Sequence, residues 1–146
     1  MKELNYKFKI ISFFIFILFS NCKLFANEKI PYLINGEMVL DSSSKYEAAG
    51  FDFCFINKSE KNIKSFTIVF YVFDEDGNPP LMGRNNIVIT VNSVVLAKES
   101  LENCVSMDSF LYEIPEEPYE IDYLYVSRIV YEDDSVWTDP FGLYSF

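Results

Sequence analysis

Carboxylates are the side chains in this sequence that could act as acids, bases or metal ligands, and they cluster in two short runs. Residues 74–76 read Asp-Glu-Asp, and residues 132–134 read Glu-Asp-Asp. An EF-hand calcium loop begins with such a run, but it also needs Gly at its sixth position and Glu at its twelfth. Here Gly77 is fourth and Asn85 is twelfth. We therefore interpret both runs as solvated turns, and we expect neither a metal site nor a cofactor.

Nucleophilic catalysis usually needs a base beside the nucleophile, and this chain contains no histidine. That absence excludes Ser-His-Asp triads, Cys-His catalytic pairs and zinc sites with histidine ligands. We therefore predict that the protein is not an enzyme. The alternative is a small carbohydrate-active or hydrolytic protein that uses carboxylates across a concave site together with Trp137, the single tryptophan.

The aromatic residues around Trp137 have two interpretations. They either form a platform that binds a sugar or a peptide, or they pack across neighbouring strands and stabilise the sheet. Packing is the default, because such pairs are common in sheets that bind nothing. The nearby tyrosines are Tyr123, Tyr125 and Tyr131.

The first 26 residues have the composition of an export signal rather than of a folded domain. Three lysines lie within the first nine residues, and a strongly apolar segment follows them. From residue 10 to residue 22 there are 13 uncharged residues, whereas a membrane-spanning helix needs about 20. We therefore predict a signal peptide over residues 1–26.

Two processing routes fit this segment. Ala26 before Asn27 suits ordinary cleavage, which would release the protein into the periplasm or the extracellular space. Residues 18–22 instead resemble a bacterial lipobox, in which Cys22 would become the lipidated first residue and anchor the protein to a membrane. Either route exports the remaining chain, which we expect to fold over residues 27–146.

The charge of the exported part excludes one class of partner. Without residues 1–26 the chain has 21 acidic and 8 basic residues, a net charge of −13. Phosphate backbones repel a domain this acidic, and the basic patch that nucleic-acid binding needs is missing. We expect no nucleic-acid partner, and we interpret the acidity mainly as a means of keeping an aromatic-rich β protein soluble. Binding of calcium or of a basic partner is the alternative explanation of the acidity.

Cys54 and Cys104 form an even pair once Cys22 is lipidated or removed. The three phenylalanines of residues 51–56 share one face of a strand, so Cys54 points to the other face. Cys104 likewise lies on the more polar side of its segment. Both thiols are therefore expected to face away from the main core, where a disulfide could join neighbouring strands; the sequence leaves that pairing open.

A strand over residues 66–73 organises the predicted fold. All eight residues are apolar, aromatic or β-branched, which is typical of a strand covered on both faces. Residues 51–56 alternate before it, and the polar residues 57–62 between the two strands predict a hairpin. Residues 74–79 contain Gly77 and predict a chain reversal.

Shorter signals complete the predicted fold. The segment 30–40 predicts two strand pieces joined by a turn at Asn35-Gly36. About seven antiparallel strands and no long helix indicate an all-β sandwich that forms a single domain. Later strands are predicted over 87–91, 104–107, 121–131 and 136–138, with a loop over 97–102 and a proline-containing surface crossing over 115–119.

One family resemblance rests on the order of these features. The Asn-x-Ser turn of Asn57 and Ser59, the apolar strand, and the Asp-x-x-Gly turn of residues 74–77 resemble FxLYD-type modules. Those modules are small immunoglobulin-like sandwiches on exported bacterial proteins and lipoproteins. The hairpin at 129–137 is similar to their closing strands. The resemblance implies an immunoglobulin-like β-sandwich and supplies no catalytic residues.

These features together predict an exported bacterial envelope protein with a binding or structural role. Its partner would be another envelope protein, contacted through loops or an exposed strand edge. The candidate surfaces are residues 30–40, 81–86 and 115–119. The predicted link to a membrane is the lipid at Cys22, and the sequence leaves the oligomeric state open.

Overall fold

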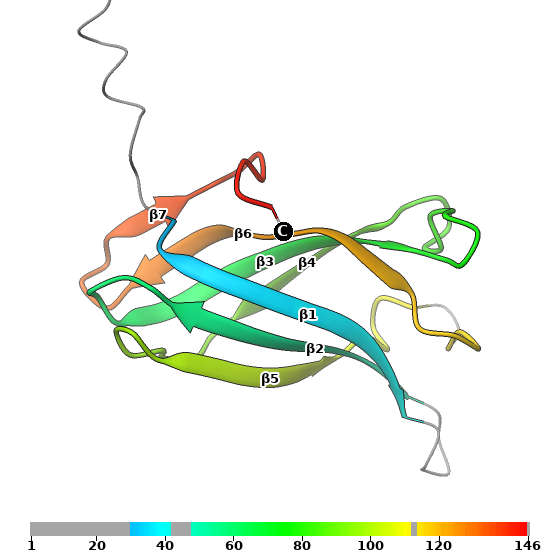
Figure 1. Cartoon of the computed structure of the whole chain (residues 1–146), viewed down its shortest axis with the longest axis horizontal. Helices are drawn as coiled ribbons and strands as arrows, with labels where there is room; N and C mark the ends of the chain where they lie inside the picture. Colours follow the sequence, from blue (N-terminus) through cyan, green and yellow to red (C-terminus); the bar gives the residue numbers. More distant parts are fainter. Residues whose placement is uncertain (1–29, 42–47, 112–113, 146) are drawn as a thin grey trace, which may run out of the picture.

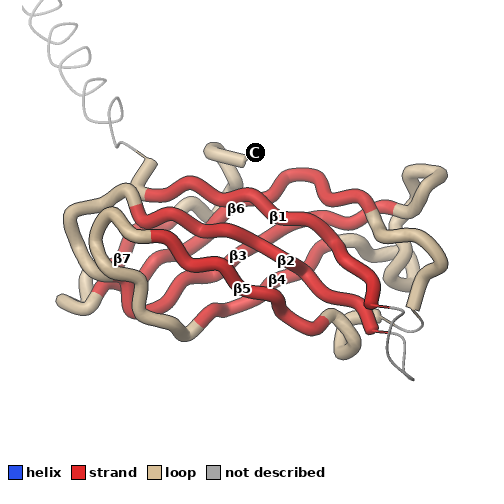
Figure 2. The backbone as a smooth tube through the Cα atoms, turned by 60° about the horizontal axis from the view of Figure 1, so that its bottom comes forward, coloured by secondary structure: helices blue, strands red, loops and turns tan. Residues whose placement is uncertain are grey.

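A computed structural model describes residues 30–41, 48–111 and 114–145, and the described chain is all-β. Its seven strands form two antiparallel sheets packed face to face (Figures 1 and 2), as the strand rhythm predicted. The three-stranded sheet has the order β1 (Tyr32–Asp41), β2 (Ala48–Asn57), β5 (Ser100–Ser106). The four-stranded sheet has the order β4 (Asn86–Val91), β3 (Ile63–Phe73), β6 (Glu120–Tyr131), β7 (Val136–Thr138).

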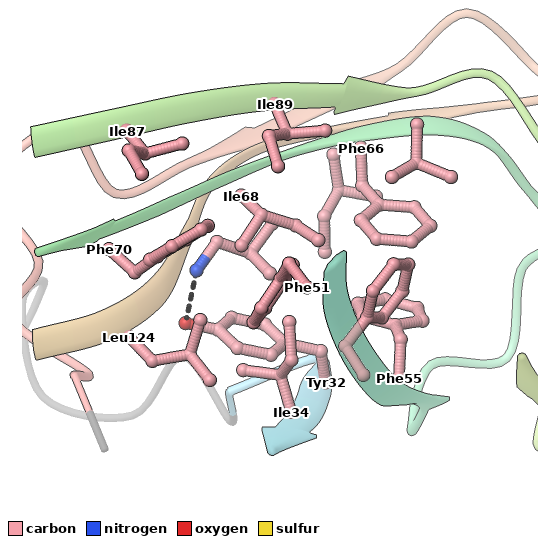
Figure 3. Close-up of a cluster of buried hydrophobic side chains, with 14 of the residues drawn as sticks. Tyr32, Ile34, Phe51, Phe55, Phe66, Ile68, Phe70, Ile87, Ile89 and Leu124 are labelled. Atoms are coloured by element: carbon pink, nitrogen blue, oxygen red, sulfur yellow. Dashed lines mark hydrogen bonds between the residues drawn. The ribbon is translucent and has the colours of Figure 1, made fainter. Parts of the chain in front are cut away.

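Aromatic side chains from the two central strands fill the space between the sheets (Figure 3). Phe51 of β2 stacks on Phe70 of β3 with 4.3 Å between ring centroids, and Phe55 stacks on Phe66 at 4.0 Å. These four rings are at most 1% exposed. Burying each contributes roughly 1.5–3 kcal/mol, so the stacked rings fix how the two sheets face each other.

β3, which contains the apolar strand predicted over residues 66–73, lies inside its sheet, but its two faces are not equally covered. The inward side chains from Phe66 to Val72 are fully buried, whereas the outward side chains of Tyr71 and Phe73 are only half-buried. Coverage of both faces, predicted from the unbroken apolar run, is therefore wrong for the outer face. Aromatic residues partly open to solvent remain there.

The connection from β2 to β3 corrects a second prediction. Both strands were expected to pair as a hairpin, yet β2 lies in the three-stranded sheet and β3 in the four-stranded sheet. The chain crosses between the sheets because the inward faces of both strands are phenylalanine-rich, so facing each other buries more apolar surface than pairing side by side.

Asn57 holds this crossing in place. Its side chain is fully buried, and its Nδ2 donates to the carbonyls of Lys61, Val95 and Leu96 at 2.8, 3.2 and 3.0 Å. Its Oδ1 accepts from the amide and hydroxyl of Ser59 at 3.0 and 2.7 Å. The Asn-x-Ser turn is thus formed as predicted, but its bonds tie the end of β2 to the segment after β4.

The predicted turn at Asn35-Gly36 is also wrong, because β1 runs through it without a break. Gly36 faces the core, and a Cβ atom there would lie 2.6 Å from the ring of Phe51 and 2.9 Å from the carbonyl oxygen of Asp52. Gly36 therefore serves the close approach of Phe51 and not a chain reversal.

Other segments agree more closely with the sequence. The last hairpin forms between β6 and β7, and the reversal after β3 contains Gly77 at φ 77°. β5 begins at Ser100, inside the predicted loop 97–102. Its side chains are mostly exposed and polar, since it is an edge strand, so apolar alternation could not mark where it starts.

Three register shifts interrupt the pairing of β6 with β3. The first lies between Ile63 and Ser65, and the other two lie beside Thr67 and beside Tyr71. Between the latter two the amide of Val126 donates to the hydroxyl of Tyr32 at 3.0 Å, the bond drawn from that hydroxyl in Figure 3. β-bulges increase local twist and re-aim side chains. The bulged part of β6 is thereby tied to β1 of the other sheet.

Candidate functional site

The best-formed cluster of exposed aromatic rings surrounds a hollow on the outer face of the four-stranded sheet. The hollow lies where β3 ends and β6 begins, and its volume is about 280 Å³. We call it the aromatic hollow. It is lined by Tyr71 and Phe73 from β3, Tyr123 and Tyr125 from β6, and Phe141 and Gly142 from the segment after β7.

A strained backbone positions Tyr123 at this site. Its φ is 50°, a left-handed conformation that costs a non-glycine residue about 1–2 kcal/mol. The carboxylate of Asp122 supports it by accepting from the Tyr123 amide at 2.8 Å. The register shift beside Tyr71 turns the Tyr123 ring outward, where it is 58% exposed and meets Tyr71 edge-on at 6.1 Å.

A turn after β7 brings Phe141 to the rim of the hollow. Asp139 is only 3% exposed, and its carboxylate accepts from the amides of Leu143 and Tyr144 at 3.0 and 3.1 Å. A buried carboxylate that accepts backbone amides in this way fixes the chain around it. Phe141 projects from this fixed turn and is 83% exposed.

Gly142 forms one side of the hollow and packs closely against the ring of Tyr125. Its φ is 63°, and a Cβ atom there would lie 3.0 Å from the ring of Tyr125. Burial raises the pKa of Tyr125, and the neighbouring charges of Tyr71 and Asp139 raise it further. The Tyr125 hydroxyl therefore stays neutral at ordinary pH and can serve only as a hydrogen-bonding group.

The surroundings of the hollow are strongly acidic. Asp122 lies opposite Tyr71 in the β3–β6 register, and Glu120 lies opposite Phe73. Residues directly opposite in antiparallel strands share one face of the sheet. Segments 74–76 and 116–122, which flank this end of β3, together carry seven acidic residues.

Three lysines of the described segments form ion pairs near the other end of β3. Lys61 pairs with Asp133 at 2.7 Å, Lys64 pairs with Asp134 at 3.1 Å, and Lys98 pairs with Glu60 at 2.7 Å. Lys61 and Lys64 lie at the start of β3, whereas the hollow lies at its end. The paired lysines and the hollow therefore lie at opposite ends of the strand.

The aromatic residues grouped in the alternative, platform interpretation are separated by the structure. Tyr123 and Tyr125 line the hollow, but Tyr131 is buried, and the ammonium of Lys61 lies 5.4 Å from its ring centroid. Tyr131 therefore belongs to the core and to the lysine end of the sheet.

Trp137 does not line the aromatic hollow either. It is half-buried against Tyr32, with ring centroids 5.6 Å apart at 70°, and against Tyr144 at 6.2 Å. Its buried Nε1 has no hydrogen-bond partner among the residues the structure describes. Packing, the default interpretation, describes its surroundings.

The two acidic runs form turns, as predicted. Asp74 accepts from the amides of Asp76 and Asn78 at 3.0 and 2.7 Å. Asp133 accepts from Lys61 and Ser135, and these bonds lower its pKa to about 2. No group of three or more potential metal ligands occurs in the described ranges. A helix long and apolar enough to cross a membrane is likewise not found there.

Cys54 and Cys104 lie on the outer face of the three-stranded sheet, away from the core as expected. The register pairs Cys54 with Glu102 and Cys104 with Asp52, so the two cysteines are diagonal neighbours on β2 and β5. Both thiols are free, and burial with the charge of Asp52 raises the pKa of Cys104. Cys22 lies outside the described residues.

Three residues of the hollow escaped the sequence reasoning. Tyr71 and Phe73 were assigned to a covered face, although their spacing of two marks a shared face. Phe141 stands in Asp139-Pro140-Phe141-Gly142, a turn-forming sequence, but nothing local shows that this turn folds onto β6.

Comparisons with known proteins bear on the fold of the chain and on no other property. No protein-family model matches the chain, and no curated protein matches it. An X-ray structure of a hypothetical protein from Peptoclostridium difficile 630 is similar, with a TM-score of 0.56 at 14% sequence identity. The match covers 77% of this chain and 88% of that one, and it supports the β-sandwich.

Proposed function

We propose that the protein is an exported, non-catalytic binding module of the bacterial envelope and that the aromatic hollow is its binding surface. One observation carries the proposal: five aromatic residues surround a surface hollow, and one of them is held there by a strained backbone. Strain of this kind persists where the surrounding structure requires it, and it concentrates at functional sites.

The exposure of the rings supports binding over packing. Phe141 and Tyr123 are the most exposed rings of the hollow, yet the turn at Asp139 and the carboxylate of Asp122 hold their backbones in place. Large apolar side chains gathered on one exposed patch typically mark a site of interaction. Leu143, two residues after Phe141, is also exposed.

The chemistry of the hollow supports a protein partner over a substrate. Its volume, about 280 Å³, lies at the lower bound of small-molecule sites, so it suits a single inserted side chain. Asp139 is the buried carboxylate near it, and backbone amides occupy that group. The export features of residues 1–26 and the resemblance to immunoglobulin-like modules support an envelope partner.

The test is capture of the partner by the exported full chain. A tagged chain is cross-linked in intact cells and recovered, beside a Tyr123→Ala/Phe141→Ala double variant. Phe110→Ala is the matched control, because Phe110 is an exposed ring that lines a different hollow. We expect a partner with the parent and the control, and its loss with the double variant. Equal recovery from all three chains would remove the hollow as the binding surface.

Export is tested separately by mass spectrometry of the mature N-terminus. We expect the mature chain to begin at Asn27. A lipidated Cys22 would replace free secretion with anchoring, and a full-length N-terminus in the cytoplasm would remove the envelope assignment altogether.

A further inference from the structure

We infer that the aromatic hollow receives the side chain of a lysine or arginine from a basic segment of the partner protein. This inference rests on the proposed function and adds the chemistry of the group that is bound. It follows from three features of the site: the rings, the carboxylates beside them, and the place of the chain's own cations.

The rings supply the first part of the argument. A cation is attracted to the face of an aromatic ring within about 6 Å of its centroid, and the attraction grows as the cation loses water. Tyr71 and Tyr123 meet edge-on with centroids 6.1 Å apart, and Phe73 and Phe141 complete the lining. A side chain entering the hollow would therefore contact more than one ring.

The carboxylates supply the second part, because an uncharged guest would not benefit from them. Glu120 and Asp122 share the face of the sheet with Phe73 and Tyr71. One oxygen of Asp122 accepts from the Tyr123 amide, and the Asp122 side chain is exposed to solvent. A lysine ammonium or an arginine guanidinium can reach these groups while its aliphatic stem packs on the rings.

The third part is the distribution of the chain's own charges. Neither lysine nor arginine is found among the residues lining the hollow, so nothing there competes for the carboxylates. The lysines of the described chain that form ion pairs do so at the opposite end of β3. The acidic end of the sheet thus fits a basic partner.

The test uses three probes with the exported full chain, followed by backbone-amide NMR. One is a short blocked glycine peptide with a central lysine, the second has norleucine in its place, and the third is tetramethylammonium. We expect the lysine peptide to shift the amides of Tyr123 and Gly142 and to bind about tenfold more tightly than the norleucine peptide. Raising the salt concentration should weaken binding of the lysine peptide but not of the norleucine peptide.

Variants separate the charges from the rings. Glu120→Gln/Asp122→Asn keeps a side-chain oxygen beside the Tyr123 amide, and we expect it to remove most of the preference for lysine while norleucine binding is unchanged. Tyr123→Ala/Phe141→Ala should abolish the shifts at Gly142 with every probe. Phe110→Ala should behave as the parent.

Three results would overturn the inference. Equal binding of the two peptides at the hollow would show that the positive charge of lysine does not contribute to binding. The hollow would then remain a binding surface without a preference for cations. Shifts with tetramethylammonium alone would show that the hollow binds a small quaternary ammonium ion and not the side chain of a partner protein. Lysine-peptide shifts confined to residues 74–76 would reveal only surface attraction. Loss of the captured partner in the double variant tests the proposed function independently of all three.

Discussion

The hydroxyl of Tyr32 accepts a hydrogen bond from the amide of Val126 at 3.0 Å and thereby joins the two sheets of the sandwich through a buried polar contact. Tyr32 is fully buried on β1, and Val126 is fully buried in the bulged part of β6. The same hydroxyl donates to the carbonyl of Tyr144 at 3.4 Å. One phenol group therefore connects β1, β6 and the turn that positions Phe141.

Removing this hydroxyl is expected to destabilise the fold. In Tyr32→Phe the Val126 amide loses its acceptor inside the core, and an unsatisfied buried donor costs about 1–3 kcal/mol. Urea unfolding should show a lower midpoint with an unchanged slope. The neighbouring variant Leu33→Ala, whose side chain is partly exposed, is the control and should change the midpoint much less. A parent-like midpoint in Tyr32→Phe would contradict the role given to this bond.

The same residue predicts a loss of stability in alkali. Burial raises the pKa of the Tyr32 hydroxyl from 10.0 to about 12, and this effect outweighs the Val126 hydrogen bond, which acts in the opposite direction. The folded state therefore holds this proton more tightly than the unfolded state. Its contribution to the free energy of unfolding is complete below pH 10 and falls as the pH rises to about 12.

Chemical unfolding at several pH values measures this effect. Tyr125, whose pKa is also raised, contributes with the same sign, so the informative quantity is the difference between the parent and Tyr32→Phe. We expect that difference to shrink steadily above pH 10. A constant difference up to pH 12 would show that Tyr32 ionises as readily in the folded chain as in the unfolded one.

Gly36→Ala is expected to destabilise the sandwich from inside a strand. The new Cβ would lie 2.6 Å from the Phe51 ring and 2.9 Å from the carbonyl of Asp52, so either the ring or the backbone must move. Overpacking of this kind typically costs about 1–3 kcal/mol. Asn35→Ala, one position earlier and facing out, is the control for thermal unfolding. Equal melting temperatures would mean that the ring can tilt away freely.

Thiol labelling followed by peptide mapping tests the cysteine pair. In the structure the Sγ of Cys104 lies only 2.7 Å from where a Cβ on Gly50 would be, so Cys104 leans toward Gly50. We expect both Cys54 and Cys104 to be labelled in unreduced, denatured protein. If both labels appeared only after reduction, the diagonal pair would be bonded and Cys104 would have rotated toward Cys54. The sequence left this disulfide open, and the labelling decides it.

The strands were largely predictable because the signals that define them are local. Alternation placed the phenylalanines of β2 on one face, and Gly77 marked a real reversal. The pairing of strands was not predictable in the same way. Asn57 turns the chain across the sandwich through bonds to Val95 and Leu96, and residues 38 and 39 positions apart give no local sign of such contacts.

The candidate site was predicted only in part for the same reason. Tyr123 and Tyr125 were named in the platform interpretation, which was the alternative to packing, and Trp137 was grouped with them because it is close in sequence. The structure sends Trp137 to Tyr32 and Tyr144 instead, and it brings Phe141 to the hollow through the turn at Asp139. Which rings meet is decided by folding across the sheet.

The carboxylates near the hollow make the end of β3 more negative than its start, where lysines are paired with carboxylates, and this difference gives the domain an electric dipole. The strand has 11 residues, so roughly 35 Å separate its paired lysines from the acidic end beside the hollow. In dilute salt, a positively charged partner that approaches the domain would rotate it before contact, so that the hollow faces the partner. The association rate would then depend on ionic strength far more steeply than the lifetime of the complex.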